Sequence, residues 1–333
     1  MNVLVTGGAG FLGRRLVREL ASEGMRVRCF LRGASNVDEL RTFVGDVLWS
    51  NVDVFRGDLM NPADCLAAVE GMDVVHHAAA GLTGSTAVMF LNTVVPTRRL
   101  IDACVEQSVK RFVLVSSLGV YGAAALRRNS VLDEACPVDP TPHRRDPYTY
   151  SKVVQEQVAW EAHRERRLPL VVIRPGVIYG PGRGALSNRI GLQVGGRMFR
   201  IGGGRQLPYV YVDHVATALR QAGLEPGVVG EAFNVLDDEL PSGKQVLGMY
   251  RRAGRGVKSM WIPQCTIGPL SSLYERYSRW SEGQLPAVIT RYRTDSMWKP
   301  LRFTNSKAKQ RLKWSPHLTF AEAFQRSIAE SSR

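Results

Sequence analysis

Long apolar runs are missing from this chain of 333 residues. None approaches the ~20 residues that a membrane-spanning helix needs. The amino terminus also lacks the basic flank and apolar core of a secretory signal peptide, because it passes directly from a short apolar strand into a glycine-rich turn. These absences predict a soluble cytoplasmic protein.

Cysteine is scarce and shows no metal-binding pattern. The five cysteines are Cys29, Cys65, Cys104, Cys136 and Cys265. They are scattered and odd in number, and no two have the spacing of a metal site. We therefore expect free thiols, a reducing compartment and no metal.

Acidic residues are scarce in the carboxyl-terminal third, although the chain carries a net charge of +14. Between Lys244 and Lys313 there are fifteen Lys and Arg residues but only three acids, Glu275, Glu282 and Asp295. Such a stretch is either a solvated surface or a binding face for an anionic membrane or a phosphorylated substrate. No nucleic-acid motif accompanies the charge, so we predict a small-molecule substrate and no nucleic-acid partner.

The first thirteen residues carry a more specific signal. Residues 2–6 form a short apolar strand, residues 7–13 read GGAGFLG, and a helix follows to about residue 23. Strand, glycine turn and helix in this order bind the pyrophosphate of a dinucleotide, with the helix amino terminus directed at the phosphates. The cofactor contacts predicted in the turn are Gly7, Gly10, Phe11, Leu12 and Gly13.

Arg32 follows the second predicted strand, at residues 26–31. Enzymes that bind the ribose 2′-hydroxyl of NAD(H) place a carboxylate about 20 residues after the glycines. A cation at this place suits a 2′-phosphate, so the sequence favours NADP(H), with NAD(H) as the alternative.

Further strands are predicted at residues 52–58, 73–77, 111–117, 169–174 and 232–236, separated by helices that include 85–107 and 147–167. This alternation predicts an α/β fold with a doubly wound parallel sheet. We expect residues 1–175 to form the dinucleotide-binding domain, with 205–236 partly returning to it, and residues 176–333 to form a smaller substrate-binding lobe. Residues 122–146 are predicted to be a loop beside the active site, and the region from about residue 243 onward is predicted to be a separate small lobe.

Predicted site residues fall at the carboxyl ends of these strands, where doubly wound sheets bind ligands. Asp58 is placed to reach the adenine amino group, and the small residues Ala78 and Ala79 allow the cofactor to lie against backbone. His76 and His77 are interpreted as residues at a strand end beside the cofactor rather than as catalytic groups.

Tyr148 and Lys152 are four residues apart and share one face of the predicted helix. A nearby ammonium lowers the pKa of a phenol, so Tyr148 becomes a candidate acid and base for proton exchange with a carbonyl or alcohol. Lys152 is also a candidate for the nicotinamide ribose. Ser117 ends the fifth strand and is placed to hold the same substrate oxygen.

The ordered motifs resemble the extended short-chain dehydrogenase/reductase family, often labelled NAD-dependent epimerase/dehydratase. They include TGGAGFLG at 6–13, GDL at 57–59, HHAAA at 76–80, YTYSK at 148–152 and RPGVIYGPG at 174–182. The resemblance implies Ser117, Tyr148 and Lys152 as the catalytic trio. It adds Leu59, Pro175 and Val177 as cofactor contacts, Asn92 at a position that is usually asparagine, and a possible homodimer.

Two branches of the family compete for the substrate. Nucleotide-sugar enzymes usually carry an asparagine where this chain has Gly176, although Arg183, Arg189, Arg197 and Arg205 remain available for a diphosphate. Residues 273–293 instead resemble the 3β-hydroxysteroid dehydrogenase branch, whose substrates are apolar. The aromatics Tyr274, Tyr277 and Trp280 would then line a substrate pocket, form core or face a membrane. We expect hydride transfer to an apolar hydroxysteroid-like or β-keto compound, with a nucleotide-sugar epimerase or dehydratase as the alternative.

Overall fold

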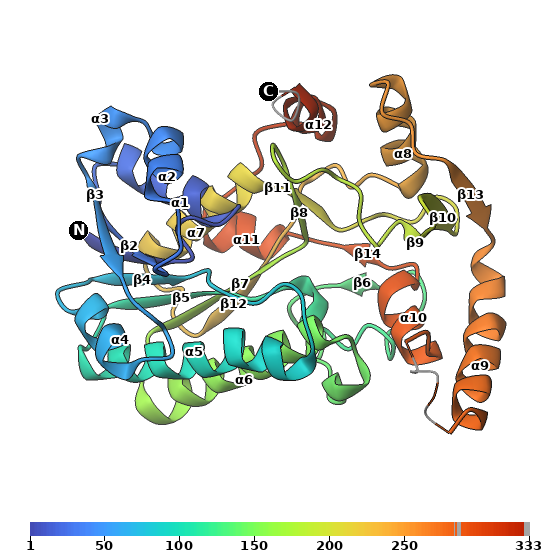
Figure 1. Ribbon diagram of the computed structural model, residues 1–333, viewed down its shortest axis with the longest axis horizontal. Coiled ribbons are helices and arrows are strands. Elements are labelled where there is room, and N and C mark those ends of the chain that lie inside the picture. Colours follow the sequence, from blue (N-terminus) through green and yellow to red (C-terminus); the bar gives the residue numbers. More distant parts are fainter. Residues whose placement is uncertain (283, 285–287, 330–333) are drawn as a thin grey trace.

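A seven-stranded parallel sheet forms the centre of the computed structural model, which describes residues 1–282, 284 and 288–329. Its strands lie in the order β12-β7-β5-β4-β1-β2-β3 (Figure 1). Their bounds are β1 Asn2–Thr6, β2 Arg26–Leu31, β3 Val52–Arg56, β4 Val74–His77, β5 Arg111–Val115, β7 Leu170–Pro175 and β12 Glu231–Val235. The predicted doubly wound sheet is therefore confirmed, and each predicted strand agrees with the observed one to within two residues.

Helices cover both faces of this sheet, which is why strands such as β5 and β7 are apolar on both sides. One face carries α1 (Gly13–Ser22), α2 (Val37–Val44), α3 (Asp46–Trp49) and α7 (Val212–Leu224). The opposite face carries α4 (Pro62–Val69), α5 (Thr86–Glu106) and α6 (Pro147–Arg166) (Figure 1). Each layer buries its own apolar cluster against the sheet.

Local sequence signals set the start of the two longest helices. Ser85 accepts a hydrogen bond from the Val88 amide before α5, and Asp146 accepts one from the Thr149 amide before α6. Pro147 occupies the first position of α6, where no intrahelical donor is needed. Capping of this kind fixes the residue at which each helix begins, so Tyr148 and Lys152 lie in the first two turns of α6.

The predicted loop 122–146 contains structure that its sequence did not indicate. Strand β6 (Val131–Leu132) pairs in parallel with β14 (Arg302–Phe303), and short 3₁₀ helices form at η1 (Leu118–Val120) and η2 (Pro142–Arg144). A two-residue strand is too short to show periodicity and is stabilised only by its distant partner.

The smaller lobe lies beyond the carboxyl ends of the central strands. It contains the parallel pair β8 (Val177–Tyr179) and β11 (Tyr209–Tyr211), and a sheet of β9 (Gly191–Val194), β10 (Arg197–Ile201) and β13 (Ser259–Ile262). Its helices are α8 (Gly243–Arg252), α9 (Gln264–Trp280), α10 (Arg291–Trp298) and α12 (Phe320–Ala329). In Figure 1, α8, β13 and α9 form the edge farthest from the amino terminus.

After this lobe the chain returns to the central sheet. Helix α11 (Ser306–Arg311) contributes Ala308 to the same buried cluster as β1 and α1, and Leu312 and Trp314 join it. The indole of Trp314 donates a hydrogen bond of 2.8 Å to the carbonyl of His214 in α7. The segment beyond residue 243 therefore contributes to both parts of the molecule.

Candidate active site

The glycine turn has the close geometry that its sequence predicts. Gly7 has φ +72°, a conformation that L side chains rarely adopt. A Cβ on Gly13 would lie 2.0 Å from the Gly7 carbonyl oxygen, so only glycine allows α1 to begin this close to β1. The Gly10 amide donates to the same carbonyl at 2.9 Å. Gly10 otherwise has open space on its Cβ side, as a backbone that approaches a pyrophosphate requires.

Ala78 and Ala79 close the other side of this turn. A Cβ on Gly7 would lie 3.0 Å from the Ala79 amide nitrogen. That amide donates to the Thr6 hydroxyl at 3.3 Å, which holds the strand end against the turn. The structure thus brings three predicted residues, Gly7, Ala78 and Ala79, together into a backbone-lined cradle that fits a dinucleotide.

Phe11 connects the turn to the loop after β8. The guanidinium of Arg15 lies 4.7 Å from the Phe11 ring centre and donates to the carbonyls of Phe11 and Pro181. Arg15 also pairs with Asp213 at 3.2 Å. Arg183 lies 5.8 Å from the Phe11 ring on the outer side. Sequence reasoning missed Arg15, because an arginine on a surface-like helix position gives no sign of a distant carbonyl partner. The adjoining Leu12 precedes α1 and is partly buried between two apolar clusters.

Arg32 is exposed directly after β2, and a second arginine lies at the same edge of the sheet. Arg56 ends β3, in register with Leu31 of β2, and its guanidinium donates to the Gly33 carbonyl at 2.7 Å. Two arginines therefore lie at the ends of adjacent strands, at the same edge of the sheet. The parallel register was the available signal for Arg56, since adjacent parallel strands end at the same edge.

Asp58 and Leu59 follow β3 at the same edge. Asp58 is exposed and accepts a hydrogen bond from the Met60 amide at 2.9 Å. Its own amide donates to Asp64 at 2.7 Å, which fixes the turn. Leu59 packs against the apolar layer beneath α4 and α5.

Pro175 and Val177 lie on either side of Gly176 at the end of β7. The Val177 amide donates to the Pro208 carbonyl at 2.7 Å. A Cβ on Gly176 would lie 2.2 Å from that carbonyl oxygen, so the asparagine usual in nucleotide-sugar enzymes does not fit this backbone. This chain therefore has glycine at position 176 because the Pro208 carbonyl leaves no room for a side chain there.

Ser117 and Tyr148 face each other across the start of α6. Ser117 caps η1 by accepting the Gly119 amide at 3.0 Å, and its hydroxyl is hydrogen bonded to the Tyr148 phenol. Burial raises the pKa of Tyr148, opposed by that hydrogen bond and by the charge of Arg183. The expected lowering of this pKa by Lys152 is not found here, because the ammonium is directed elsewhere. A protonated phenol at neutral pH is a proton donor.

Lys152 is buried and binds two oxygens of its own layer. Its ammonium donates to the Val115 carbonyl at 2.8 Å and to the Gln155 side chain at 2.9 Å. Burial lowers the pKa of Lys152 to about 7, although the charge of Glu156 acts in the opposite direction. The pKa of an ordinary lysine is about 10.4, so the Lys152 ammonium loses its proton much closer to neutral pH.

A chain of buried hydrogen bonds extends from Gln155 to β1. The Gln155 amide donates to Thr97 at 2.8 Å, His77 contacts the same Thr97 oxygen at 2.8 Å, and Thr6 contacts the other His77 nitrogen at 2.7 Å. Thr97 donates its own proton to the Thr93 carbonyl. The network therefore assigns the His77 proton to Nε2, and burial lowers the pKa of His77 to about 3. His77, the last residue of β4, is therefore a neutral structural link between β1 and α5.

His76 faces the opposite layer, where Gly223 of α7 leaves room for its ring. Burial lowers the pKa of His76 to about 3, so it too is neutral. Asn92 is exposed on α5 and donates to the Val88 carbonyl at 2.8 Å.

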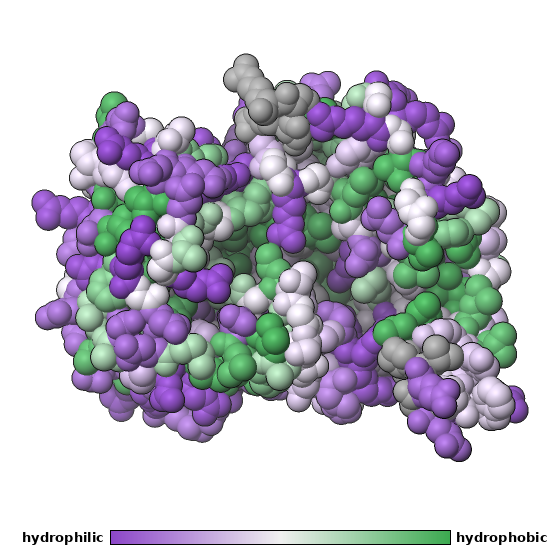
Figure 2. Space-filling model, in the orientation of Figure 1, coloured by the Kyte–Doolittle hydropathy of each residue, from purple (hydrophilic) through white to green (hydrophobic). Residues whose placement is uncertain are grey.

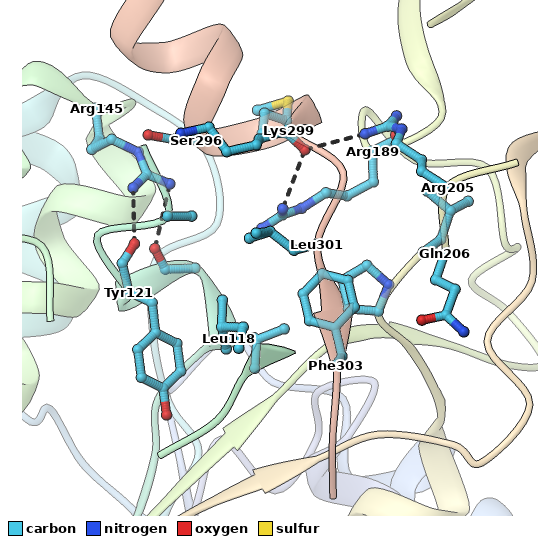
Figure 3. A pocket seen from close by; sticks show the side chains of 16 residues that line it. Leu118, Tyr121, Arg145, Arg189, Arg205, Gln206, Ser296, Lys299, Leu301 and Phe303 are labelled. Atoms are coloured by element: carbon cyan, nitrogen blue, oxygen red, sulfur yellow. Dashed lines mark hydrogen bonds between the residues drawn. The ribbon is translucent and has the colours of Figure 1, made fainter. Parts of the chain in front are cut away.

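A pocket lies next to Ser117, lined by Leu118 and Gly119 among others (Figure 3). Its apolar wall comes from both parts of the molecule and includes Leu118, Leu132, Leu301 and Phe303. Tyr274, Tyr277 and Trp280 are absent from its lining. Tyr277 and Trp280 are instead exposed and stacked on each other, so the expected pocket wall or core role does not hold for these two.

Two arginines without an acidic partner line the opposite wall of this pocket. Arg189 and Arg205 both donate to the Met297 carbonyl, at 3.3 and 3.4 Å (Figure 3). Among the described residues no carboxylate lies within ion-pair distance of either one, whereas the neighbouring Arg145 pairs with Asp139 at 2.8 Å. Burial and the neighbouring positive charge lower the pKa of Arg205 to about 9 and that of Arg189 to about 10.

The described part of the chain contains no cluster of His, Cys, Asp and Glu that would hold a metal ion. No helix in the same part is both long enough and apolar enough to cross a bilayer. All five cysteines are free.

Comparisons with known proteins agree with this geometry. The sequence profile of the NAD dependent epimerase/dehydratase family matches residues 3–235. The 2-alkyl-3-oxoalkanoate reductase of Stenotrophomonas maltophilia is 30% identical over the full length of both chains. The sterol-4-alpha-carboxylate 3-dehydrogenase, decarboxylating, of Bos taurus is 27% identical over 71% of this chain and 65% of its own.

Solved structures share the whole fold. The UDP-glucuronic acid 4-epimerase from Bacillus cereus, solved in complex with NAD, superposes with a TM-score of 0.73 at 20% identity, covering 100% of this chain and 99% of that one. At this identity the similarity concerns the fold alone. Profile, relatives and site together show that the chain belongs to the NAD-dependent epimerase/dehydratase family and is an NAD(P)-dependent oxidoreductase of the extended short-chain dehydrogenase type.

Proposed function

We propose that this enzyme transfers a hydride between NADP(H) and a 3-hydroxy or 3-oxo compound with a large apolar part. The observation that carries the proposal is the Ser117–Tyr148 pair, which lies at the same edge of the sheet as the glycine turn and next to a pocket with one apolar wall. The two relatives named above act on substrates whose reacting carbon neighbours a carboxylated carbon. Their names support a β-keto or β-hydroxy compound as the substrate class.

Each member of the trio has a distinct role in this proposal. Tyr148, whose raised pKa keeps it protonated, donates its proton to the carbonyl oxygen in the reductive direction and accepts one from the alcohol in the oxidative direction. Ser117 holds the same oxygen. Lys152 orients the nicotinamide ribose and supplies positive charge beneath the site. The nicotinamide cofactor supplies or accepts the hydride when it is bound.

NADP(H) is proposed over NAD(H) because Arg32 and Arg56 both stand at the end of the second and third strands. A guanidinium pair binds a phosphate strongly and gains little from a ribose hydroxyl. Thermal unfolding with each cofactor tests this preference: we expect a larger stabilisation with NADP⁺, and its loss in the variant Arg32→Glu. A larger shift with NAD⁺ in the unaltered enzyme would contradict it.

The direct test of the reaction is consumption of NADPH with a panel of 3-oxo acids, cyclic ketones and UDP-sugars. We expect net oxidation of the cofactor with at least one apolar 3-oxo compound. Conversion of a UDP-sugar without net change in cofactor absorbance, and no reaction with any ketone, would reject the proposal.

A nucleotide-sugar epimerase or dehydratase is the second candidate, and one observation favours it. Arg189 and Arg205 lie in the pocket without acidic partners and would suit a diphosphate. Against it stands Gly176, where the usual asparagine has no room. A regulator without turnover is the third class, and the presence of all three residues of the trio argues against it.

We also propose a homodimer formed through α5 and α6, by analogy with the family. Val88 and Leu91 are exposed on α5, which supports an interface there. The proposed partners are otherwise a small-molecule substrate and no nucleic acid, in a cytoplasmic setting.

A further inference from the structure

We propose that α9, with the end of β13, is a docking surface for an anionic membrane. The proposal goes beyond the reaction, because it concerns a face of the lobe that the pocket does not use. We call this the α9 surface and define it by its exposed apolar residues Met260, Trp261, Leu270, Leu273, Tyr277 and Trp280.

The first observation is the density of exposed apolar groups. These six side chains are between 52% and 76% exposed and fall within 21 residues of sequence. They include the two tryptophans that are exposed in the described part of the chain. Figure 2 shows hydrophobic side chains gathered on the margin of the molecule where Figure 1 places α9. Isolated exposed apolar residues are ordinary, but a contiguous group marks an interaction site.

The second observation is the helical phase of the exposed residues. Ile267, Ser271 and Ser278 face inward and are buried. Leu270, Leu273, Tyr277 and Trp280 recur every three or four residues and form a separate stripe along the outer side. Helix α9 is therefore apolar on a face that no other described element covers.

The third observation is the charge beside this stripe. Arg276 and Arg279 are exposed on the same helix, and Arg251, Arg252 and Lys258 are exposed just before it. Residues 251–282 contain six cations and two acids. A helix with Trp, Tyr and Leu on one side and arginine on the other is the pattern of a helix that lies in the membrane interface. Tryptophan and tyrosine rings favour the level of the lipid headgroups.

The positive charge of the α9 surface favours an anionic membrane over a second copy of the chain as its partner. Two copies meeting through the α9 surface would bring the same cations opposite each other, and like charges at close range repel. An anionic bilayer offers both phosphate oxygens for the arginines and an apolar interior for the stripe. The contact is peripheral, since no described helix can span a bilayer.

The position of α9 also connects the surface to the pocket. Ser271 of α9 donates to Thr294 of α10 at 3.2 Å, and Ser296 and Met297 of α10 line the pocket. A membrane at the α9 surface would therefore lie one helix away from the site, which suits an apolar substrate drawn from lipid.

The test is co-sedimentation of the full chain with vesicles, either of phosphatidylcholine alone or of phosphatidylcholine mixed with phosphatidylglycerol. We expect binding to the anionic vesicles only, weakening as salt rises. Leu273→Ser with Trp280→Ser, and separately Arg276→Gln with Arg279→Gln, should each lower the partition coefficient about tenfold or more. The matched control Val47→Ser alters a side chain that is 86% exposed on α3 and should leave binding unchanged.

Thermal unfolding and NADP⁺ binding should be unchanged in every variant, since all of these side chains are exposed. Failure of the unaltered chain to sediment with anionic vesicles at low salt would overturn the proposal, as would binding by both double variants equal to that of the unaltered chain. A dimer in solution that Leu273→Ser with Trp280→Ser converts to a monomer would assign the surface to a second copy instead. None of these outcomes depends on turnover, so they are independent of the proposed reaction.

Discussion

Tyr148 is the residue on which the proposed chemistry depends most directly. Replacing it with phenylalanine keeps the ring and removes the proton that the proposed mechanism has Tyr148 exchange with the substrate oxygen. We expect Tyr148→Phe to lower kcat by about 10²–10⁴ while the Kd of NADP⁺ changes little. The control is Tyr150→Phe, because Tyr150 lies on the same helix but packs edge-on against Phe90. Retained turnover in Tyr148→Phe would remove this residue from the mechanism.

The buried ammonium of Lys152 leads to a prediction about the pH dependence of kcat/KM. Its pKa of about 7 means that the charged form is lost as pH rises through neutrality. If the ammonium is required, kcat/KM falls on the basic side of about pH 7. The charged group that acts on it is Glu156, which favours the ammonium, while the nearby His77 is neutral.

Gln155 tests whether the buried chain positions this ammonium. Gln155→Met removes one of its two acceptors and should move the basic limb to lower pH by about one unit. Gln155→Glu supplies a carboxylate and should move the limb to higher pH. A purely structural role would change thermal stability and leave the limb in place in both variants. Gln221→Met on α7 serves as the control.

At the scale of one element, the close approach of α1 to β1 depends on the absence of a side chain at Gly13. Gly13→Ala would place a methyl group 2.0 Å from the Gly7 carbonyl oxygen, so strand and helix must separate. We expect a loss of about 1–3 kcal/mol in the free energy of unfolding and a large rise in the Kd of the cofactor. Chemical denaturation and cofactor titration measure the two effects.

Gly248→Ala in α8 is the matched control, because nothing lies within 4 Å of a Cβ at that position. Alanine in a helix interior is favoured over glycine by about 0.5–1 kcal/mol, so this variant should be slightly more stable. Equal behaviour of the two variants would show that the turn tolerates a side chain and would weaken its assignment as a phosphate cradle.

Among the described residues of the whole molecule, exposed apolar side chains gather on α5 and, separately, on α9. The proposed homodimer uses the first. Light scattering should give twice the chain mass of 36.9 kDa for the unaltered protein. Leu91→Arg should return it to one chain mass, since a buried unpaired charge is costly. A monomer at all concentrations, or a dimer insensitive to this change, would contradict an interface on α5.

The sequence alone indicated the parallel sheet, the glycine turn and the positions of Ser117, Tyr148 and Lys152. These features depend on local rules: apolar periodicity, glycine spacing and the one-turn separation of two side chains on a helix. Arg32 was visible for the same reason, since it follows a strand at a fixed distance from the turn.

Only the tertiary structure decided which groups meet across long sequence separations. The chain of hydrogen bonds from Thr6 through His77, Thr97 and Gln155 to Lys152 joins four elements, β1, β4, α5 and α6, and no local pattern indicates it. The exclusion of a side chain at Gly176 depends on Pro208, which a separate strand brings within contact. The exposure of Trp280 likewise depends on which face of α9 packs on α10. Such pairings are fixed by packing and hydrogen bonding between distant segments, so sequence periodicity carries no record of them.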